Sequence, residues 1–303
     1  MKLIKALSLA VALSASLFVI PASSPVVAAE DAGHEAHFEY QRQKWSFGGF
    51  SGNFDKAQLQ RGFQVYQEKC STCHALSRVN FRNLVQPGGP EFPEDSVKAL
   101  AAGWPNRPLA EPDDAGSTVD KKGNLLERTP LLSDPILGPY RNDKQARAVH
   151  NGAVPPNLSL IAKARNLHND GFWPYHVGKM LRDIALGYQE GGPDYIYNLL
   201  VNYKDEKEMP KGFKLAEGMN YNPAFPGNQI AMAPPLAKDN FVKYQDGKGS
   251  LEDNARDIAA FLAWASDPSL NQRKAMGWQV LLYLVIASIL LYIGKKRVWA
   301  DKH

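Results

Sequence analysis

The stretch "EKCSTCHAL", residues 68–76, contains the only two cysteines of the 303-residue chain. Cys70 and Cys73 are three positions apart, and His74 follows the second cysteine directly. Two thiols beside an imidazole fit a zinc site, a redox pair, a structural disulfide or a covalent cofactor. Each of these makes a different demand on the rest of the chain.

Three of the four explanations meet an obstacle. Zinc needs four ligands, and the only other candidate nearby is His74. A thioredoxin-type redox pair needs a βαβ context, and no strand alternation surrounds the motif. A disulfide across a two-residue gap closes a tiny loop and stabilises little. Cys-x-x-Cys-His is the signature of haem c attachment. We therefore predict one haem c, bound covalently through Cys70 and Cys73, with His74 as an iron ligand.

The flanking sequence predicts two helices that would enclose such a haem. Residues 57–69 and 251–266 both repeat apolar positions at spacings of three and four. Ser250 can cap the second helix, and Pro268 stops it. Gly62 would let the two helices approach closely. The predicted crossing is filled by Phe63, Phe261 and Trp264.

The N-terminus has the pattern of a secretory signal peptide over residues 1–29. Lys2 and Lys5 precede an apolar stretch over 6–20, and small residues follow it. The alternative, a membrane anchor, is disfavoured because the run is shorter than the ~20 residues that a spanning helix needs.

The C-terminal part predicts a single membrane anchor. Residues 276–293 carry no charge, and a helix of this length spans about 27 Å, close to the hydrocarbon thickness of a bilayer. The basic cluster at 295–297 is expected to stay in the cytoplasm. The predicted organisation is a periplasmic haem domain (30–272), a transmembrane anchor (273–295) in the inner membrane and a short cytoplasmic tail (296–303).

The charge of the chain divides along the same boundaries. The whole chain has a formal charge of +4, but residues 30–272 hold 27 basic and 30 acidic residues, a net charge of −3. A mildly acidic exported domain argues against nucleic acid and favours a basic protein partner.

The region between the motif and the closing helix reads as long loops with short helices and no convincing strands. Residues 86–143 are rich in proline, glycine and aspartate. Helices are predicted at 95–102, 144–150, 158–165, 176–187 and 193–203. An acidic run that is either a solvated loop or a steering surface for a basic electron carrier comprises Glu91, Glu94, Asp95, Glu111, Asp113 and Asp114.

The second axial ligand is predicted to be Met232. Methionine is the usual partner of histidine in cytochromes c and raises the redox potential. Met232 has apolar neighbours, and Pro234 and Pro235 keep its loop from becoming helical. The alternatives are Met180 (more simply a core residue), Met209, Met219, His34, His37, His150, His168 and His176.

Several stretches together resemble the cytochrome c1 family, the haem c subunit of the cytochrome bc1 complex, in its alphaproteobacterial form. They are "WSFGGFSGNFD" (45–55), "QLQRGFQVYQEKCSTCHAL" (58–76), "NGAVPPNLSLIAKAR" (151–165), "DYIYNLLVNY" (194–203), "YNPAFPGNQIAMAPPLAKD" (221–239) and "DIAAFLAWASDPSLNQRK" (257–274). The fold that this implies is mostly α: a cytochrome c-type haem domain with long loop insertions and one C-terminal transmembrane helix.

The resemblance also implies roles for particular residues. Met232 would be the distal iron ligand. Arg165 would contact a haem propionate, and Pro156 and Tyr195 would pack around the haem. Electrons would pass from the Rieske iron–sulfur protein to a soluble or anchored cytochrome c. This chain would be an electron-carrying subunit of ubiquinol–cytochrome c oxidoreductase, in a dimeric complex with cytochrome b, and would perform no substrate chemistry alone.

The sequence departs from the family pattern in two respects, and three other functions compete with this interpretation. Some bacterial members have an extra cysteine pair that this chain lacks, so no disulfide would hold residues 176–192, and residues 104–143 match least well. The rivals are another anchored c-type cytochrome serving an oxidase or dehydrogenase, a haem enzyme with an open iron position, and a thiol–disulfide oxidoreductase.

Overall fold

The chain is mostly helical, as predicted. The computed structural model describes residues 38–110, 118–120, 122–167, 173–186, 188, 190–237, 240–244, 247 and 249–300, so the predicted signal peptide lies outside the described residues. The α-helices are α1 (Lys56–Val65), α2 (Glu94–Ala102), α3 (Asp143–Val149), α4 (Ile161–Ala164), α5 (Trp173–Leu186), α6 (Gly191–Val201), α7 (Leu251–Ser266) and α8 (Leu270–Trp299). A π-helical turn, η1 (Tyr66–Cys70), continues α1, and 3-10 turns form η2 (Phe81–Leu84), η3 (Leu158–Leu160) and η4 (Glu206–Glu208).

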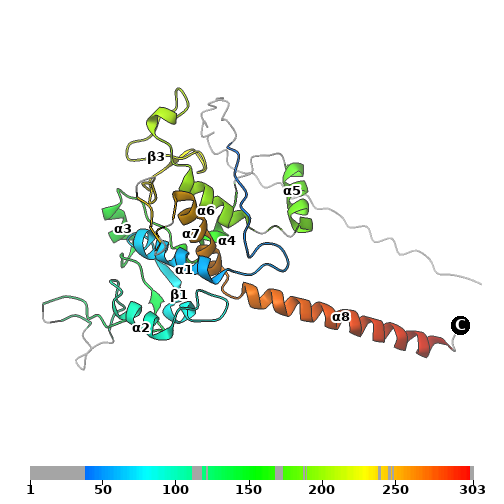
Figure 1. The fold of residues 1–303 in the computed structure, drawn as a ribbon. Helices are drawn as coiled ribbons and strands as arrows, with labels where there is room; N and C mark the ends of the chain where they lie inside the picture. The colour runs from blue at the N-terminus through cyan, green and yellow to red at the C-terminus, as the bar shows by residue number, and fades with distance from the viewer. Residues whose placement is uncertain are drawn as a thin grey trace, which may run out of the picture. The chain divides into compact units, whose positions relative to one another are not determined.

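Helices α1 and α7 cross at the centre of the core, where they lie side by side (Figure 1). A Cβ placed on Gly62 would lie only 2.2 Å from the carbonyl oxygen of Asp257 and 2.6 Å from Cβ of Phe261. Only glycine permits this approach. The predicted role of Gly62 is therefore confirmed, and the aromatic rings expected at the crossing, those of Phe63, Phe261 and Trp264, are all buried there.

Helix α7 begins and ends where the sequence predicts. Ser250 Oγ accepts a hydrogen bond from the backbone N–H of Asp253 (3.1 Å), which satisfies one of the free donors at the helix start. The helix ends at Ser266, two residues before Pro268. Its apolar face is almost wholly buried, so α7 is the central element of the domain.

A buried carboxylate links this crossing to the loop that precedes α7. Asp257 accepts hydrogen bonds from Arg61 Nε (2.7 Å), Tyr244 Oη (2.7 Å) and Gln58 Nε2 (3.2 Å). Three donors from α1 and the loop thus converge on one side chain of α7. Because a buried charge is tolerated only when it is paired, this network fixes the loop against both helices.

The Gly62→Ala variant is expected to be destabilised by about 3 kcal/mol, because the added methyl group meets backbone rather than a movable side chain. For a domain of this size the denaturation temperature falls by about 6–12 °C. Thermal denaturation of the purified holoprotein, followed by circular dichroism, measures the shift. Gly103→Ala is the control, since its Cβ would have no neighbour closer than 3.5 Å. Equal stability of the two variants would contradict the close crossing.

The expectation of no strands is wrong in detail. Strand β1 (Leu76–Asn80) pairs with β2 (Pro135–Ile136), and β3 (Asn220–Tyr221) pairs with β4 (Gln229–Ile230), both antiparallel. Three of these strands are only two residues long, too short for a two-residue alternation to be visible. The partners β1 and β2 are separated by a long loop, so their pairing depends on tertiary structure.

The other predicted helices are confirmed with shifted ends. Helices α2, α3 and α6 lie within two residues of their predicted starts. The predicted helix at 158–165 is instead a 3-10 turn followed by the short α4. Asn157 caps that turn by accepting a hydrogen bond from the N–H of Ser159 (2.9 Å). The predicted helix at 176–187 begins earlier, at Trp173.

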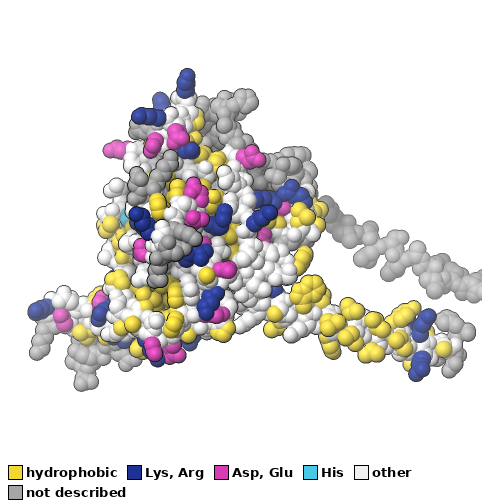
Figure 2. Space-filling model, in the orientation of Figure 1, with side chains coloured by type: hydrophobic (Ala, Val, Ile, Leu, Met, Phe, Trp, Pro, Cys, Tyr) yellow, Lys and Arg dark blue, Asp and Glu magenta, His cyan; other side chains and the backbone are white. Residues whose placement is uncertain are grey.

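Helix α8 has the length and composition of a membrane span. Its most apolar 18-residue window has a mean hydropathy of 2.0, and none of that window is buried within the protein. Its side chains form a continuous apolar surface that ends in basic residues (Figure 2). An apolar helix that the protein does not cover fits a transmembrane anchor.

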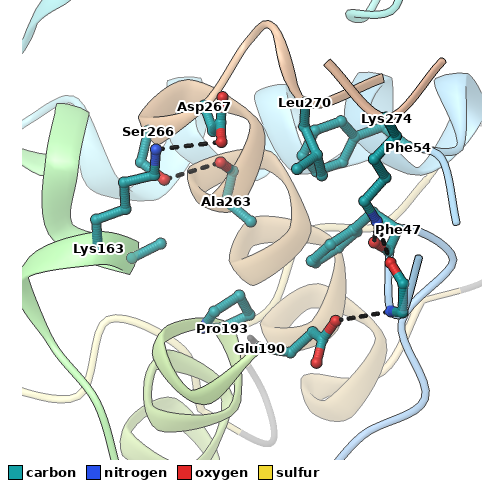
Figure 3. Close-up of a pocket in the computed structure, with 12 residues that line it drawn as sticks. Phe47, Phe54, Lys163, Glu190, Pro193, Ala263, Ser266, Asp267, Leu270 and Lys274 are labelled. Carbon is teal, nitrogen blue, oxygen red and sulfur yellow. Dashed lines mark hydrogen bonds and ion pairs between the residues drawn. The ribbon is translucent and has the colours of Figure 1, made fainter. Parts of the chain in front are cut away.

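The start of α8 is attached to the N-terminal loop by Lys274. Its Nζ donates hydrogen bonds to the carbonyl oxygens of Phe47 (2.6 Å), Gly49 (2.6 Å) and Gly52 (3.1 Å). A cavity of about 90 Å³ lies beside this contact (Figure 3). On the other side of this cavity, Glu190 accepts a hydrogen bond from the N–H of Gly49 (3.1 Å). We call the contact of Lys274 with these three carbonyls the anchor joint.

Candidate haem site

The two thiols lie at the end of η1 and in the tight turn that follows it. The N–H groups of Cys73 and His74 both donate to the carbonyl oxygen of Cys70, at 3.1 and 2.8 Å. No disulfide joins the two cysteines. Burial, followed by the neighbouring Cys73, raises the pKa of Cys70 to about 12. The attacking thiol of a thiol–disulfide oxidoreductase needs the opposite, a lowered pKa.

The imidazole of His74 is oriented for metal binding. Its Nδ1 lies 2.8 Å from the carbonyl oxygen of Pro156, which can only accept, so Nδ1 carries the proton. The lone pair of Nε2 is then available to a metal. Burial lowers the pKa of His74, which keeps the ring neutral. The Tyr66 hydroxyl donates to the carbonyl of His74 (3.1 Å) and fixes the backbone behind it.

The segment that contains Pro156 lies along the strand that follows the motif. The N–H of Leu158 donates to the carbonyl of Ala75 (2.9 Å), and the N–H of Arg78 donates to Ser159 Oγ (3.0 Å). The contact between Pro156 and His74 is therefore one of several that hold the two segments together. In the described residues, no group of three or more His, Cys, Asp or Glu side chains could bind a metal ion by itself. The donors present, two thiols and one oriented imidazole, fit haem c.

Met232 lies two residues after β4 and is half-buried. Its carbonyl oxygen accepts hydrogen bonds from Tyr203 Oη (3.1 Å) and Asn220 Nδ2 (3.4 Å). The alternative Met180, interpreted as a core residue, is 55% exposed on α5, so that interpretation is wrong. His34, His37 and His168 lie outside the described residues.

Arg165 and Tyr195 are neighbours on a second pair of elements. Tyr195 is 4% exposed on α6, and Arg165 is an exposed residue at the end of α4. Burial raises the pKa of Tyr195 to about 12, although the charge of Arg165 acts against this rise. The structure thus brings Cys70, Cys73, His74 and Pro156 into one cluster and Arg165 and Tyr195 into another. Met232 accepts a hydrogen bond from Tyr203, which follows α6, the helix that contains Tyr195.

The sequence did not reveal a tyrosine–histidine pair beside the thiols. Tyr140 Oη lies 2.6 Å from His150 Nε2, and the two rings pack edge to face. Burial, followed by Cys73, raises the pKa of Tyr140, so its hydroxyl is close to that sulfur. His150 was an alternative iron ligand, and one of its ring nitrogens is engaged by Tyr140. No motif indicates this pair, which joins a residue of the 86–143 loop region to the C-terminal end of α3.

Part of the predicted acidic run is paired within the domain. Glu91 forms an ion pair with Lys56 (3.3 Å), and Glu94 forms one with Lys98 (2.8 Å). Asp95 also lies 3.6 Å from Lys98. The rest of the run, at 111–114, lies outside the described residues. The described acidic residues therefore have local partners and are not a free negative patch.

An oriented imidazole beside two thiols, in a mostly helical domain joined to an apolar helix, is typical of membrane-anchored c-type cytochromes. Comparison with protein families narrows the class. Residues 45–302 match the Cytochrome C1 family. This chain belongs to the cytochrome c1 family.

Curated relatives agree over most of the chain. It is 43% identical to cytochrome c1 of Blastochloris viridis over 279 residues, which cover 92% of this chain and 91% of that protein. It is 38% identical to cytochrome c1 of Rhodospirillum rubrum, with 89% and 91% covered. It is also 38% identical to the mitochondrial cytochrome c1 haem protein of Neurospora crassa, with 92% and 71% covered. The chain is therefore a haem c-containing electron-transfer subunit of the cytochrome bc1 complex in a respiratory chain.

Proposed function

We propose that this chain accepts electrons from the Rieske iron–sulfur protein and passes them to a soluble or anchored cytochrome c. The observation that carries the proposal is the hydrogen bond from His74 Nδ1 to the carbonyl of Pro156. It presents Nε2 beside two thiols in a domain of the cytochrome c1 family. When bound, haem c supplies a one-electron couple, and the protein residues only attach and orient it.

Each predicted site residue has a role in this proposal. Cys70 and Cys73 would form the thioether links, and His74 would be one iron ligand. Met232 would be the other, and its thioether would favour the ferrous state and so raise the potential. Held by these residues, haem c would supply one-electron chemistry. The pocket is completed by Pro156 and Tyr195 as packing residues and by Arg165, whose exposed cation suits a propionate.

The same proposal includes the topology. Residues 1–29 direct export and are removed, residues 30–272 form the periplasmic haem domain, and residues 273–295 cross the inner membrane. The basic cluster at 295–297 favours a cytoplasmic tail at 296–303. Cytochrome b and the Rieske protein are the proposed membrane partners in a dimeric complex.

The electron path is tested by rapid mixing of the purified, oxidised complex with ubiquinol while the haem c absorption is recorded. We expect reduction of the haem in the complete complex and no fast reduction after the Rieske protein is removed. Fast reduction without the Rieske protein would exclude the proposed donor. If the chain copurified with an oxidase or a dehydrogenase and not with cytochrome b, the proposal of another anchored c-type cytochrome would replace this one.

A further inference from the structure

The backbone of Met232 is held by two side chains that the sequence did not single out. Its carbonyl oxygen accepts one hydrogen bond from the Tyr203 hydroxyl (3.1 Å) and one from the Asn220 amide (3.4 Å). Tyr203 follows the end of α6, and Asn220 is the first residue of β3.

The two donors belong to one connected unit. Asn222, which is fully buried, donates from Nδ2 to the carbonyl of Leu199 in α6 (2.8 Å). The N–H of Lys204 donates to the carbonyl of Tyr221 (3.3 Å). The β3–β4 hairpin is thereby fixed to α6, which packs on the central helix α7. Movement of Met232 relative to this unit must break its bonds to Tyr203 or Asn220.

The chain after Met232 is fixed separately. Leu236 is buried, and the backbone N–H and carbonyl of Val242 pair with the amide side chain of Asn254 in α7 (2.6 and 3.0 Å). Met232 itself lies in neither a helix nor a strand. Its loop is therefore held at both ends, and the bonds from Tyr203 and Asn220 act at the ligand position between them.

We propose that Tyr203 and Asn220 are positioning residues that keep the Met232 thioether on the haem iron. The inference rests on the proposed axial role of Met232. A thioether is a neutral, weak ligand. The fraction of iron to which it is bound therefore depends on the free-energy cost of ordering the loop that carries it. Loss of one hydrogen bond to the loop should raise the fraction of haem iron that lacks the thioether about fivefold.

The test uses the purified membrane complex carrying Tyr203→Phe, which removes one hydroxyl and keeps the ring. We expect the reduced protein to bind carbon monoxide to a larger extent than the wild type. We also expect the ferric protein to lose the weak absorption band of thioether-ligated haem at a lower temperature. Asn220→Leu, which removes the second donor, should have the same effect, and it gives the answer if Tyr203→Phe fails to assemble.

Tyr244→Phe is the matched control. It also removes a tyrosine hydroxyl from a short hydrogen bond, to Asp257 at 2.7 Å, but at the α1–α7 crossing. It should lower overall stability without increasing carbon monoxide binding at a temperature where the protein is folded. Equal ligand loss in the Tyr203 and Tyr244 variants would mean a general structural role and would overturn the inference.

Met232→Leu separates this inference from the axial assignment. If Met232→Leu opens the iron fully while Tyr203→Phe and Asn220→Leu behave as the wild type, the positioning role is wrong and the ligand assignment stands. If Met232→Leu leaves carbon monoxide binding unchanged, Met232 is not the ligand, and both proposals fail.

Discussion

Met232→Leu is expected to keep the haem attached but to lower its redox midpoint potential by ~0.2 V, within the range over which axial ligands tune haem. The thioether stabilises ferrous iron, and leucine offers no donor in its place. Attachment persists because it depends on Cys70 and Cys73. A redox titration of the purified complex, followed by the haem c absorption, measures the shift.

The control for this prediction is Met180→Leu. It makes the same chemical change at an exposed position of α5 and should leave the potential unchanged. An unaltered potential in both variants would refute the assignment of Met232. A shift in Met180→Leu alone would make Met180 the ligand.

Truncation before Arg273 is expected to transfer the haem domain from the membrane to the soluble fraction. The apolar part of α8 has no buried residues in its 18-residue window, so only lipid compensates for its exposure. Fractionation followed by haem staining measures the distribution. If the truncated chain stayed in the membrane pellet after a salt wash, a second attachment would exist and the single-anchor topology would be wrong.

A shorter truncation, which keeps the chain up to Gly277, restores the anchor joint together with the ion pair between Arg273 and Asp267. It also removes most of the apolar helix but retains Lys274 and its bonds to the carbonyls of Phe47, Gly49 and Gly52. Both truncated domains should be soluble, and the longer one should denature at the higher temperature. Equal denaturation temperatures would show that the joint adds nothing to the stability of the domain.

The sequence predicted those parts of the fold that depend on local patterns. The bounds of α7 follow from a capping serine, a terminating proline and a regular apolar spacing. Gly62 could be recognised because a helix interior disfavours glycine without a packing reason. The orientation of His74 could not be predicted, because its partner Pro156 lies 82 residues away in the chain.

The missed features are side-chain pairs that local patterns do not reveal. Tyr140 pairs with His150, 10 residues away, and Tyr203 pairs with Met232, 29 residues away. Met180 is interpreted as a core residue because its segment has the pattern of a helix, yet its side chain is exposed. Periodicity shows that a helix has an apolar face but does not show what covers it. The roles of Arg165, Pro156 and Tyr195 at the haem remain predictions that follow from family resemblance.

For the proposed electron path, the anchor joint would have a consequence for the rate of electron transfer. The ammonium group of Lys274 is surrounded by three main-chain oxygens, much as a small cation is in a carbonyl cage. Such a contact resists both twisting and sliding of the first turn of α8 against the loop at 47–52. The rate of electron tunnelling falls exponentially with distance. A domain that could rotate about its membrane anchor would place its redox centre at widely varying distances from a partner. In the proposed electron path, a lysine more than 220 residues from its acceptors would therefore narrow the spread of tunnelling distances to an electron-transfer partner.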